Sequence, residues 1–237
     1  MLLQEARSNV GGLSDTYKMP GESFGLTIEE TCHVGKKLAK IPGSVCSKCY
    51  ADPEQFGRYG LDEVQDAQKA RLDLWENDRE LWKESMILIF NSKKLRKKPW
   101  FRWFDSGDIY SKEFLEDILE VCKASPHMNF WIPTKEYGIA KKYQNRLPDN
   151  VVMRVSHPDL NLINPKIEEN YNWTSAVLTP NEFDAKIYDG FYCPSSSPEH
   201  NGQCKDCTTC WERPEKLVFY KYHNRDVKSV QQIWGIM

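Results

Sequence analysis

The residues of this chain that are best suited to chemistry are its cysteines. The 237-residue sequence has eight cysteines, and seven of them fall into two groups near the two ends of the chain. The N-terminal cysteine group is Cys32, Cys46 and Cys49, and the C-terminal cysteine group is Cys193, Cys204, Cys207 and Cys210. Four thiolates can fill the coordination sphere of a metal centre, whereas three leave one position open for a ligand or a substrate.

The C-terminal cysteine group carries the stronger metal signal. The run CKDCTTC places three cysteines at regular intervals, with Cys193 as a more distant fourth. This pattern favours iron–sulfur ligation over a zinc ribbon, whose ligands usually form two separate pairs. A structural zinc knuckle is the alternative, and His200 or His223 could then replace one cysteine.

The N-terminal cysteine group predicts an open site. Three thiolates on a [4Fe–4S] cluster leave one iron free, and a free iron can bind a cofactor or a substrate. If His33, the neighbour of Cys32, is a fourth ligand, the site is closed and structural. A third interpretation treats these thiols as unrelated to one another. Cys122 lies on the apolar face of a predicted helix, which indicates a buried thiol.

Hydrophobic patterning predicts strands that alternate with helices. The predicted strands are 23–26, 100–104, 129–133, 150–156, 175–179 and 217–222. The predicted helices are 62–91, as one helix or two joined near 77–78, then 112–123, 139–145 and a short terminal helix at 226–233. Residues 1–31 read as an irregular lead-in with one short strand, and Asp62 with Gln65 resembles a capping box.

Short connections between these elements predict an α/β fold of parallel βα units, arranged as a TIM-like barrel or partial barrel. We expect residues 1–180 to form this core, including the N-terminal cysteine loop. Residues 181–237 would form a C-terminal Cys-rich metal-binding extension packed on it.

Polar residues follow the predicted strands, where the ligand sites of such folds lie. Asp105, Ser106, Gly107 and Asp108 follow the strand WFRWF. Either carboxylate could act as an acid or base, Gly107 would allow a ligand close to the backbone, and plain turn chemistry is the alternative. Lys135 and Glu136 follow the next strand and would face the substrate.

Charge and composition limit the classes of partner that this chain can bind. The net charge of −2 excludes a globally basic nucleic-acid-binding protein. A local basic stretch beside Trp100 and Trp103 allows single-stranded nucleic acid, although a solvated helix end is the favoured interpretation. Its residues are Lys93, Lys94, Arg96, Lys97 and Lys98. The sequence shows neither a signal peptide nor a long apolar run, so we expect a cytoplasmic protein without a membrane partner.

Five motifs carry a resemblance to a known family. In order, they are KIPGSVCSKCYA, WFRWFDSGDIYS, NFWIPTKEYG, LPDNVVMRVS and GQCKDCTTCW. From Lys40 to Trp211, the chain resembles the gene-product-eighty-eight family of bacteriophage and prophage proteins. The resemblance implies a phage-encoded protein in the cytoplasm of a host cell.

The chain is also similar, more distantly, to radical S-adenosylmethionine enzymes. That resemblance implies a [4Fe–4S] cluster on Cys32, Cys46 and Cys49, with S-adenosylmethionine at its free iron. The segment Asp105–Asp108, which includes Ser106 and Gly107, would take the position that contacts the methionine amine. Arg154 or Ser156 would help to hold the cofactor. The C-terminal cysteine group would hold an auxiliary cluster.

For such an enzyme we expect a small-molecule or nucleotide substrate and an electron donor protein, and the phage setting adds nucleic acid as a further option. The cysteine spacing differs from the usual one, and Asp-Ser-Gly-Asp replaces a Gly-Gly-Glu type motif.

A second resemblance supplies a competing hypothesis. The DSGD loop is similar to the DSGG loop of tRNA-guanine transglycosylases, whose phage relatives exchange guanine in DNA for a 7-deazaguanine. It implies that Asp105 recognises a base or acts as acid and base, and that the C-terminal cysteine group holds structural zinc. A third hypothesis is a zinc-stabilised module that binds nucleic acid or a host protein.

Overall fold

The computed structural model describes residues 1–54 and 59–222. Within these residues, eight strands form one sheet in the order β1-β2-β3-β4-β5-β6-β8-β7. The strands are β1 (Ser14–Asp15), β2 (Glu22–Phe24), β3 (Trp100–Trp103), β4 (Asn129–Thr134), β5 (Val151–Leu160), β6 (Thr174–Leu178), β7 (Phe191–Tyr192) and β8 (Leu217–Lys221). The short strand β1 is antiparallel to β2, and the other neighbouring pairs are parallel.

The sheet is open, with β1 and β7 at its two edges. The succession of parallel strands from β2 to β6 confirms the predicted βα units. A closed TIM-like barrel is wrong, because closure requires the first and last strands to pair. Here the edge strands contain only two residues each, and neither pairs with the other.

The helices connect the strands. They are α1 (Leu3–Asn9), α2 (Ile28–Thr31), α3 (His33–Ala39), α4 (Asp62–Asn77), α5 (Arg79–Phe90), α6 (Lys93–Lys97), α7 (Lys112–Lys123), α8 (Tyr137–Tyr143), α9 (Pro165–Asn170) and α10 (Pro180–Ala185), with the 3₁₀ turns η1 (Val45–Lys48) and η2 (Pro194–Ser196). Two helices fill the predicted span 62–91, and Asp78 separates them by accepting a hydrogen bond from the Leu81 N–H.

Two local predictions are wrong. Residue Leu61, not Asp62, precedes the first turn of α4, and no side chain caps it. The lead-in contains two helices, α1 and α2, in addition to its short strand. The predicted terminal helix 226–233 and His223 lie outside the described residues.

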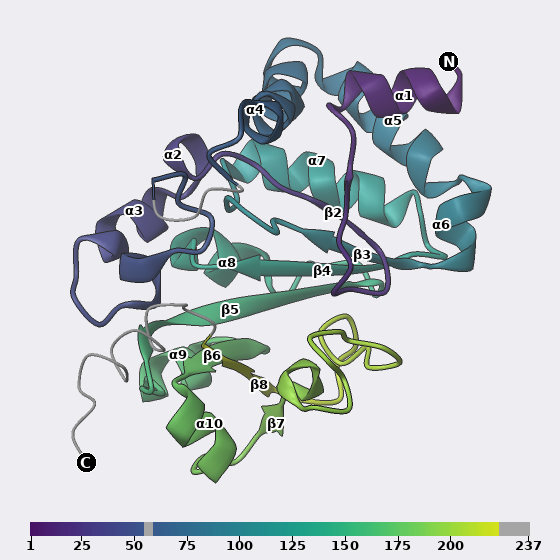
Figure 1. Cartoon of the computed structure of the whole chain (residues 1–237). Helices are drawn as coiled ribbons and strands as arrows, with labels where there is room; N and C mark the ends of the chain where they lie inside the picture. The colour runs from purple at the N-terminus through teal and green to yellow at the C-terminus, as the bar shows by residue number, and fades with distance from the viewer. Residues whose placement is uncertain (55–58, 223–237) are drawn as a thin grey trace.

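One face of the sheet, here called the helical face, is covered by α1, α4, α5 and α7 (Figure 1). Alternation along β3 directs Phe101 and Trp103 to this side, where both are fully buried. Phe90 of α5 lies 4.8 Å from Phe101 and 5.0 Å from Phe130, measured between ring centroids. Cys122 is buried on α7 in the same core, as its helix position predicts.

The other face, here called the opposite face, is covered by the loop that carries the C-terminal cysteine group (Figure 1). Trp211 packs there against Trp131 at 5.4 Å and Trp100 at 6.0 Å between ring centroids. Its indole N–H donates to the Phe101 carbonyl at 2.8 Å. The segment after residue 180 also supplies β7 and β8 to the common sheet, and the predicted domain boundary at 180 stays a prediction.

Candidate metal centre

The N-terminal cysteine group lies on the segment that follows β2, near the carboxyl ends of the central strands. Cys32 separates α2 from α3, Cys46 lies in η1, and Cys49 follows it. Ser44 fixes η1, because its Oγ accepts from the Ser47 N–H at 3.1 Å and donates to the Leu38 carbonyl at 2.6 Å. All three thiols are free and half-buried.

Gly35 leaves space beside two of these sulfurs. A Cβ added at Gly35 would lie 3.7 Å from the Cys32 Sγ and 3.8 Å from the Cys46 Sγ. The two sulfurs therefore face the same small volume, which a side chain at position 35 would fill. A volume lined by thiols is what a sulfur-ligated metal group requires.

Burial raises the pKa of all three thiols. For Cys32, the charges of Asp108, Cys49 and Cys46 raise the pKa further, whereas Lys135 lowers it. Lys135 also lowers the pKa of Cys46 and of Cys49. These thiols therefore stay protonated unless a cation replaces the protons, as metal ligation does.

Asp108 is the central carboxylate of this region. Its Oδ1 accepts from the Thr134 hydroxyl at 2.6 Å and from the Ile109 N–H at 2.8 Å, and its Oδ2 accepts from the Lys135 N–H at 2.8 Å. Burial raises the pKa of Asp108 to about 6 against these hydrogen bonds, which lower it. The backbone N–H of Asp108 donates to the Thr31 hydroxyl, next to Cys32.

Glu136 connects the β4 loop to the N-terminal cysteine group. The buried carboxylate accepts from the Val34 N–H at 2.9 Å, and the Glu136 N–H donates to the Thr134 hydroxyl at 2.9 Å. The structure thus brings Asp108, Lys135 and Glu136 to the three thiols. The sequence analysis missed Thr31 and Thr134, although Thr134 stands directly before the Lys-Glu pair at a strand end.

The side chains of Asp105 and Ser106, the first half of the DSGD loop, form hydrogen bonds within the protein interior. Asp105 Oδ2 accepts from the Ser23 hydroxyl at 2.8 Å, and the Ser106 hydroxyl donates to the Leu26 carbonyl and accepts from Gln68. Gly107 has a φ of 75°, and a Cβ added there would lie 2.6 Å from the Thr31 Oγ1. Asp105 and Ser106 therefore hold the loop in place in this structure, and only Asp108 faces the cysteine side.

The two residues of β5 that were predicted to hold a cofactor make different contacts. The Ser156 hydroxyl is 3.2 Å from the Ser175 hydroxyl. Arg154 is fully buried on the opposite face, and it donates to six backbone carbonyls. These carbonyls belong to Thr174, Thr209, Cys210, Glu212, Glu215 and Lys216. Its guanidinium thus organises the C-terminal cysteine loop.

The C-terminal cysteine group is anchored through its backbone to β8 and to the segment before β2. The Cys193 N–H donates to the Phe219 carbonyl, and the Cys204 N–H donates to the Lys18 carbonyl at 2.7 Å. Burial raises the pKa of Cys204 to about 11 and that of Cys210 to about 12, and the charge of Cys193 raises both further. The Cys210 Sγ is 3.1 Å from the Tyr220 hydroxyl.

Within residues 1–54 and 59–222, no group of three or more His, Cys, Asp or Glu side chains has the spacing that one metal ion requires. A [4Fe–4S] cluster places its thiolates on different irons, which accepts a wider spacing than one zinc ion at about 2.3 Å from each sulfur. His33 Nε2 lies 2.9 Å from the Tyr110 carbonyl and His200 Nδ1 lies 3.1 Å from the Gln203 carbonyl, so each has one ring nitrogen engaged by the backbone.

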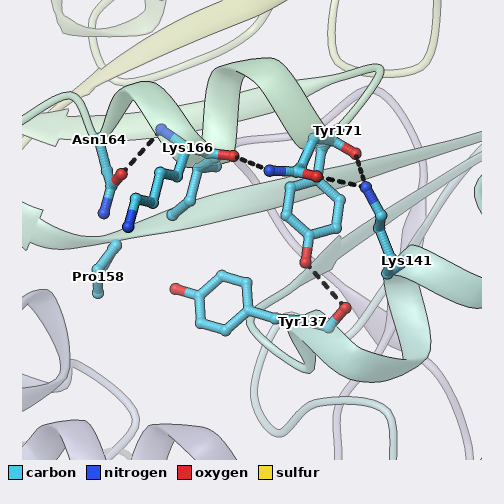
Figure 2. A pocket seen from close by; sticks show the side chains of 8 residues that line it. Tyr137, Lys141, Pro158, Asn164, Lys166 and Tyr171 are labelled. Atoms are coloured by element: carbon cyan, nitrogen blue, oxygen red, sulfur yellow. Dashed lines mark hydrogen bonds between the residues drawn. The ribbon is translucent and has the colours of Figure 1, made fainter.

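A cleft of about 370 Å³ lies between α8, α9 and the end of β5. Figure 2 shows Tyr137 and Tyr171 meeting in it, where the Tyr171 hydroxyl donates to the Tyr137 carbonyl. The charges of Cys46 and Asp108 act on the Tyr137 hydroxyl, whose pKa is raised chiefly by burial. Tyr137 therefore lines this cleft and also interacts electrostatically with Cys46. The sequence analysis did not single it out.

The basic stretch is only partly available to nucleic acid. Trp103 is fully buried, and Lys94 forms ion pairs with Asp15 at 2.9 Å and Glu22 at 2.6 Å. A second depression, of about 380 Å³, is lined by two lysines of the basic stretch and by one lysine of the C-terminal cysteine loop. It is lined by Pro20, Lys97, Lys98, Trp100, Lys205, Asp206 and Thr208.

None of the helices in the described part of the chain has both the length and the apolar composition needed to cross a lipid bilayer. Comparison with curated proteins and with solved structures gives no significant match. The sequence profile of one family, described as Gene product 88, matches residues 3–213. This match contains both cysteine groups, the DSGD loop and the strands that position them. The chain therefore belongs to the Gene product 88 family.

Proposed function

We propose that this protein is a phage-encoded iron–sulfur enzyme of the radical S-adenosylmethionine type, acting on a small molecule or a nucleotide. The observation that carries the proposal is the position of the three half-buried thiols. They lie on the segment that follows β2, and two of them, Cys32 and Cys46, border the space beside Gly35. Parallel α/β sheets bind their ligands beyond the carboxyl ends of their strands.

Cys32, Cys46 and Cys49 would hold the cluster, which would supply one electron for the reductive step. The chain's own residues then have separate tasks. Lys135 balances the negative charge of the thiolates, as its effect on all three thiol pKa values indicates. Asp108 is placed to accept a hydrogen bond from a bound amine, and its pKa of about 6 allows it to exchange a proton near neutral pH. Glu136 fixes the backbone beside Cys32.

The C-terminal cysteine group would hold a second cluster with a structural or electron-transfer role. Its four thiols lie behind the sheet, and Arg154 holds the loop that carries two of them. The donor set is soft sulfur, which suits iron or zinc.

The test is oxygen-free purification followed by iron and sulfide analysis. We expect a brown protein with about eight irons per chain if both groups hold [4Fe–4S] clusters, and loss of about half on Cys46→Ser. Cys207→Ser is the matched change in the other group and should remove the other half. A colourless protein that contains zinc alone would contradict the proposal.

Zinc alone would favour the base-exchange or binding-module hypothesis instead. The depression that contains Lys97, Lys98 and Lys205 favours the binding module, since three cations beside Trp100 suit a phosphate backbone. Salt-sensitive binding of single-stranded DNA, abolished by Lys97→Gln with Lys98→Gln and accompanied by no turnover, would identify that function.

A further inference from the structure

Arg102 is the most unusual charged residue of the opposite face. It lies in the middle of β3, where the sheet register aligns Ser23, Arg102 and Trp131 in one row across β2, β3 and β4. Alternation along β3 directs the Arg102 side chain away from the helical face. Its guanidinium lies over the Trp131 ring, 4.6 Å from the ring centroid.

The hydrogen bonds of Arg102 are few and long. Its Nη2 donates to the Tyr50 hydroxyl at 3.3 Å and to the Phe104 carbonyl at 3.3 Å. The Nε is buried and has no hydrogen-bond partner. Among residues 1–54 and 59–222, no carboxylate forms an ion pair with Arg102.

The other two buried arginines behave differently. Arg154 donates to six backbone carbonyls. Arg71 donates to the Gly12 carbonyl at 3.1 Å and to the Gly25 carbonyl at 2.7 Å. A protein interior normally satisfies such donors, because an unpaired buried donor costs free energy and an unpaired charge costs more. The half-buried Arg102 departs from this rule and remains partly accessible to solvent.

Arg102 lies between the two cysteine groups, and this position indicates a role for its unpaired donors. Tyr50 directly follows Cys49, and its hydroxyl donates to the Asp105 carbonyl above Arg102. On the other side, Tyr220 lies 6.2 Å from Trp131 between ring centroids and contacts Cys210. Arg102 thus lies below the DSGD loop, surrounded by aromatic rings, with free donors.

We infer that Arg102 binds the anionic group of a small organic ligand, a phosphate or a carboxylate, on the opposite face of the sheet beneath the N-terminal cysteine group. A guanidinium is planar, and its N–H groups match the two oxygens of such a group, while the Trp131 ring at 4.6 Å helps to hold it in place. The Tyr50 hydroxyl adds a neighbouring polar atom. The inference goes beyond the proposed function, because it holds whichever metal the thiols bind.

The ligand is a small molecule, not a nucleic-acid strand. Trp211 and the C-terminal cysteine loop cover the neighbouring part of this face, so a polymer could not lie along it. The exposed lysines of the Lys97 depression belong to a different surface and make a different prediction.

Calorimetric titration of the purified chain with inorganic phosphate, citrate and adenosine monophosphate tests the inference. We expect saturable binding of at least one probe at one molecule per chain. Arg102→Gln should weaken it at least ten-fold, and Arg102→Lys should weaken it less, because lysine keeps the charge and loses the planar fork. Arg146→Gln is the matched control, since Arg146 is an exposed arginine that follows α8 and lies outside the basic stretch, and it should leave affinity unchanged.

The three probes separate the two ligand classes, as phosphate and adenosine monophosphate report a phosphate site and citrate a carboxylate site. Absence of saturable binding by the wild-type chain, or equal binding by Arg102→Gln, overturns the inference. If Arg102→Gln does not fold, phenylglyoxal modification of the wild type replaces it. Arg102 should then react, and the bound probe should protect it; reaction that no probe slows also overturns the inference. Iron content measured on the same samples reports the proposed function separately.

Discussion

The N–H of Val34 donates a hydrogen bond to the Glu136 carboxylate at 2.9 Å, although 102 residues separate the two in sequence. Val34 lies two residues after Cys32, and Glu136 follows β4. The bond therefore ties the N-terminal cysteine group to the centre of the sheet. The position of the three thiols therefore depends on β4 as well as on their own loop.

This bond predicts a difference between two substitutions of Glu136. Glu136→Ala should lower the free energy of unfolding by about 1–3 kcal/mol, because it leaves the partly buried Val34 N–H without an acceptor. It should also lower the iron content. Glu136→Gln keeps an acceptor oxygen and should cost less than about 1 kcal/mol. Urea denaturation and iron analysis of both variants provide the measurement, and identical behaviour of the two variants would argue against the role of this bond.

Gly35 predicts a variant that loses metal without losing stability. Gly35→Leu should fill the volume beside the Cys32 and Cys46 sulfurs and abolish iron binding by that group. Leucine favours a helix over glycine by about 0.8 kcal/mol, so the fold should survive. Gly138→Leu is the control, since it lies in α8 and a Cβ there has open space. Full iron content in Gly35→Leu would show that the space does not belong to a metal site.

Arg154 predicts a local failure of the C-terminal cysteine loop. Arg154→Leu removes the donors of six carbonyl contacts and should cost at least about 3 kcal/mol. Limited proteolysis should then cut between residues 193 and 216. Arg213→Gln is a suitable comparison, because Arg213 is more exposed and donates to two carbonyls only. Its cost should stay below about 1 kcal/mol. Equal resistance of both variants to protease would refute the prediction.

Two glycines with similar backbones should respond differently to alanine. Gly107 and Gly12 have φ values of 75° and 70°, which disfavour any side chain. At Gly107 an added Cβ would lie 2.6 Å from the Thr31 Oγ1 and 2.8 Å from the Leu26 Cβ, whereas at Gly12 it would meet nothing within 4 Å. Gly12→Ala should cost about 1 kcal/mol for the backbone alone. Gly107→Ala should cost about 1–2 kcal/mol more, because Thr31 must move. Thermal unfolding of the two variants decides whether the contact matters.

Asp108 predicts the pH dependence of stability. Its pKa of about 6 in the folded protein lies above the ordinary value of 3.8, so the folded state retains a proton that the unfolded state has lost. The contribution is fully favourable below about pH 4 and is lost as the pH rises through about 6. The loss is on the order of 3 kcal/mol, since one pKa unit corresponds to about 1.4 kcal/mol.

Asp108→Asn cannot titrate, so the difference in unfolding free energy between wild type and variant isolates this carboxyl. Wild type should lose stability relative to Asp108→Asn between pH 4 and pH 6 and remain level above pH 7. A difference that does not vary with pH, or that changes in the opposite direction, would show that the hydrogen bonds to Asp108 outweigh its burial.

Local patterns allowed most of the sheet to be predicted. The strand pattern of WFRWF and the helical spacing of residues 112–123 depend on neighbours in sequence, and both have the expected structure: β3 covers Trp100–Trp103, and α7 covers Lys112–Lys123. The open edges could not be predicted, because they depend on whether two remote strands of two residues pair.

The candidate site was predictable by position, but the direction of each side chain was not. Asp105 and Asp108 are three residues apart and look equivalent in the sequence. The Ser23 hydroxyl donates to Asp105, whereas the Thr134 hydroxyl and the Lys135 N–H donate to Asp108. These partners lie on or next to strands that are remote in sequence. The contacts of Arg154 could not be predicted for the same reason, since its carbonyl acceptors lie up to 62 residues away.

The late position of Trp211 has a consequence for the chain during its synthesis. Trp100 and Trp131 belong to strands that a ribosome completes well before it reaches the residue that covers them. A nascent chain that has folded its first strands therefore exposes two indoles to the crowded surroundings. Chains released before residue 211 would keep these indoles exposed, and the exposed apolar surface favours aggregation. Premature termination of translation before position 211 should therefore yield insoluble fragments.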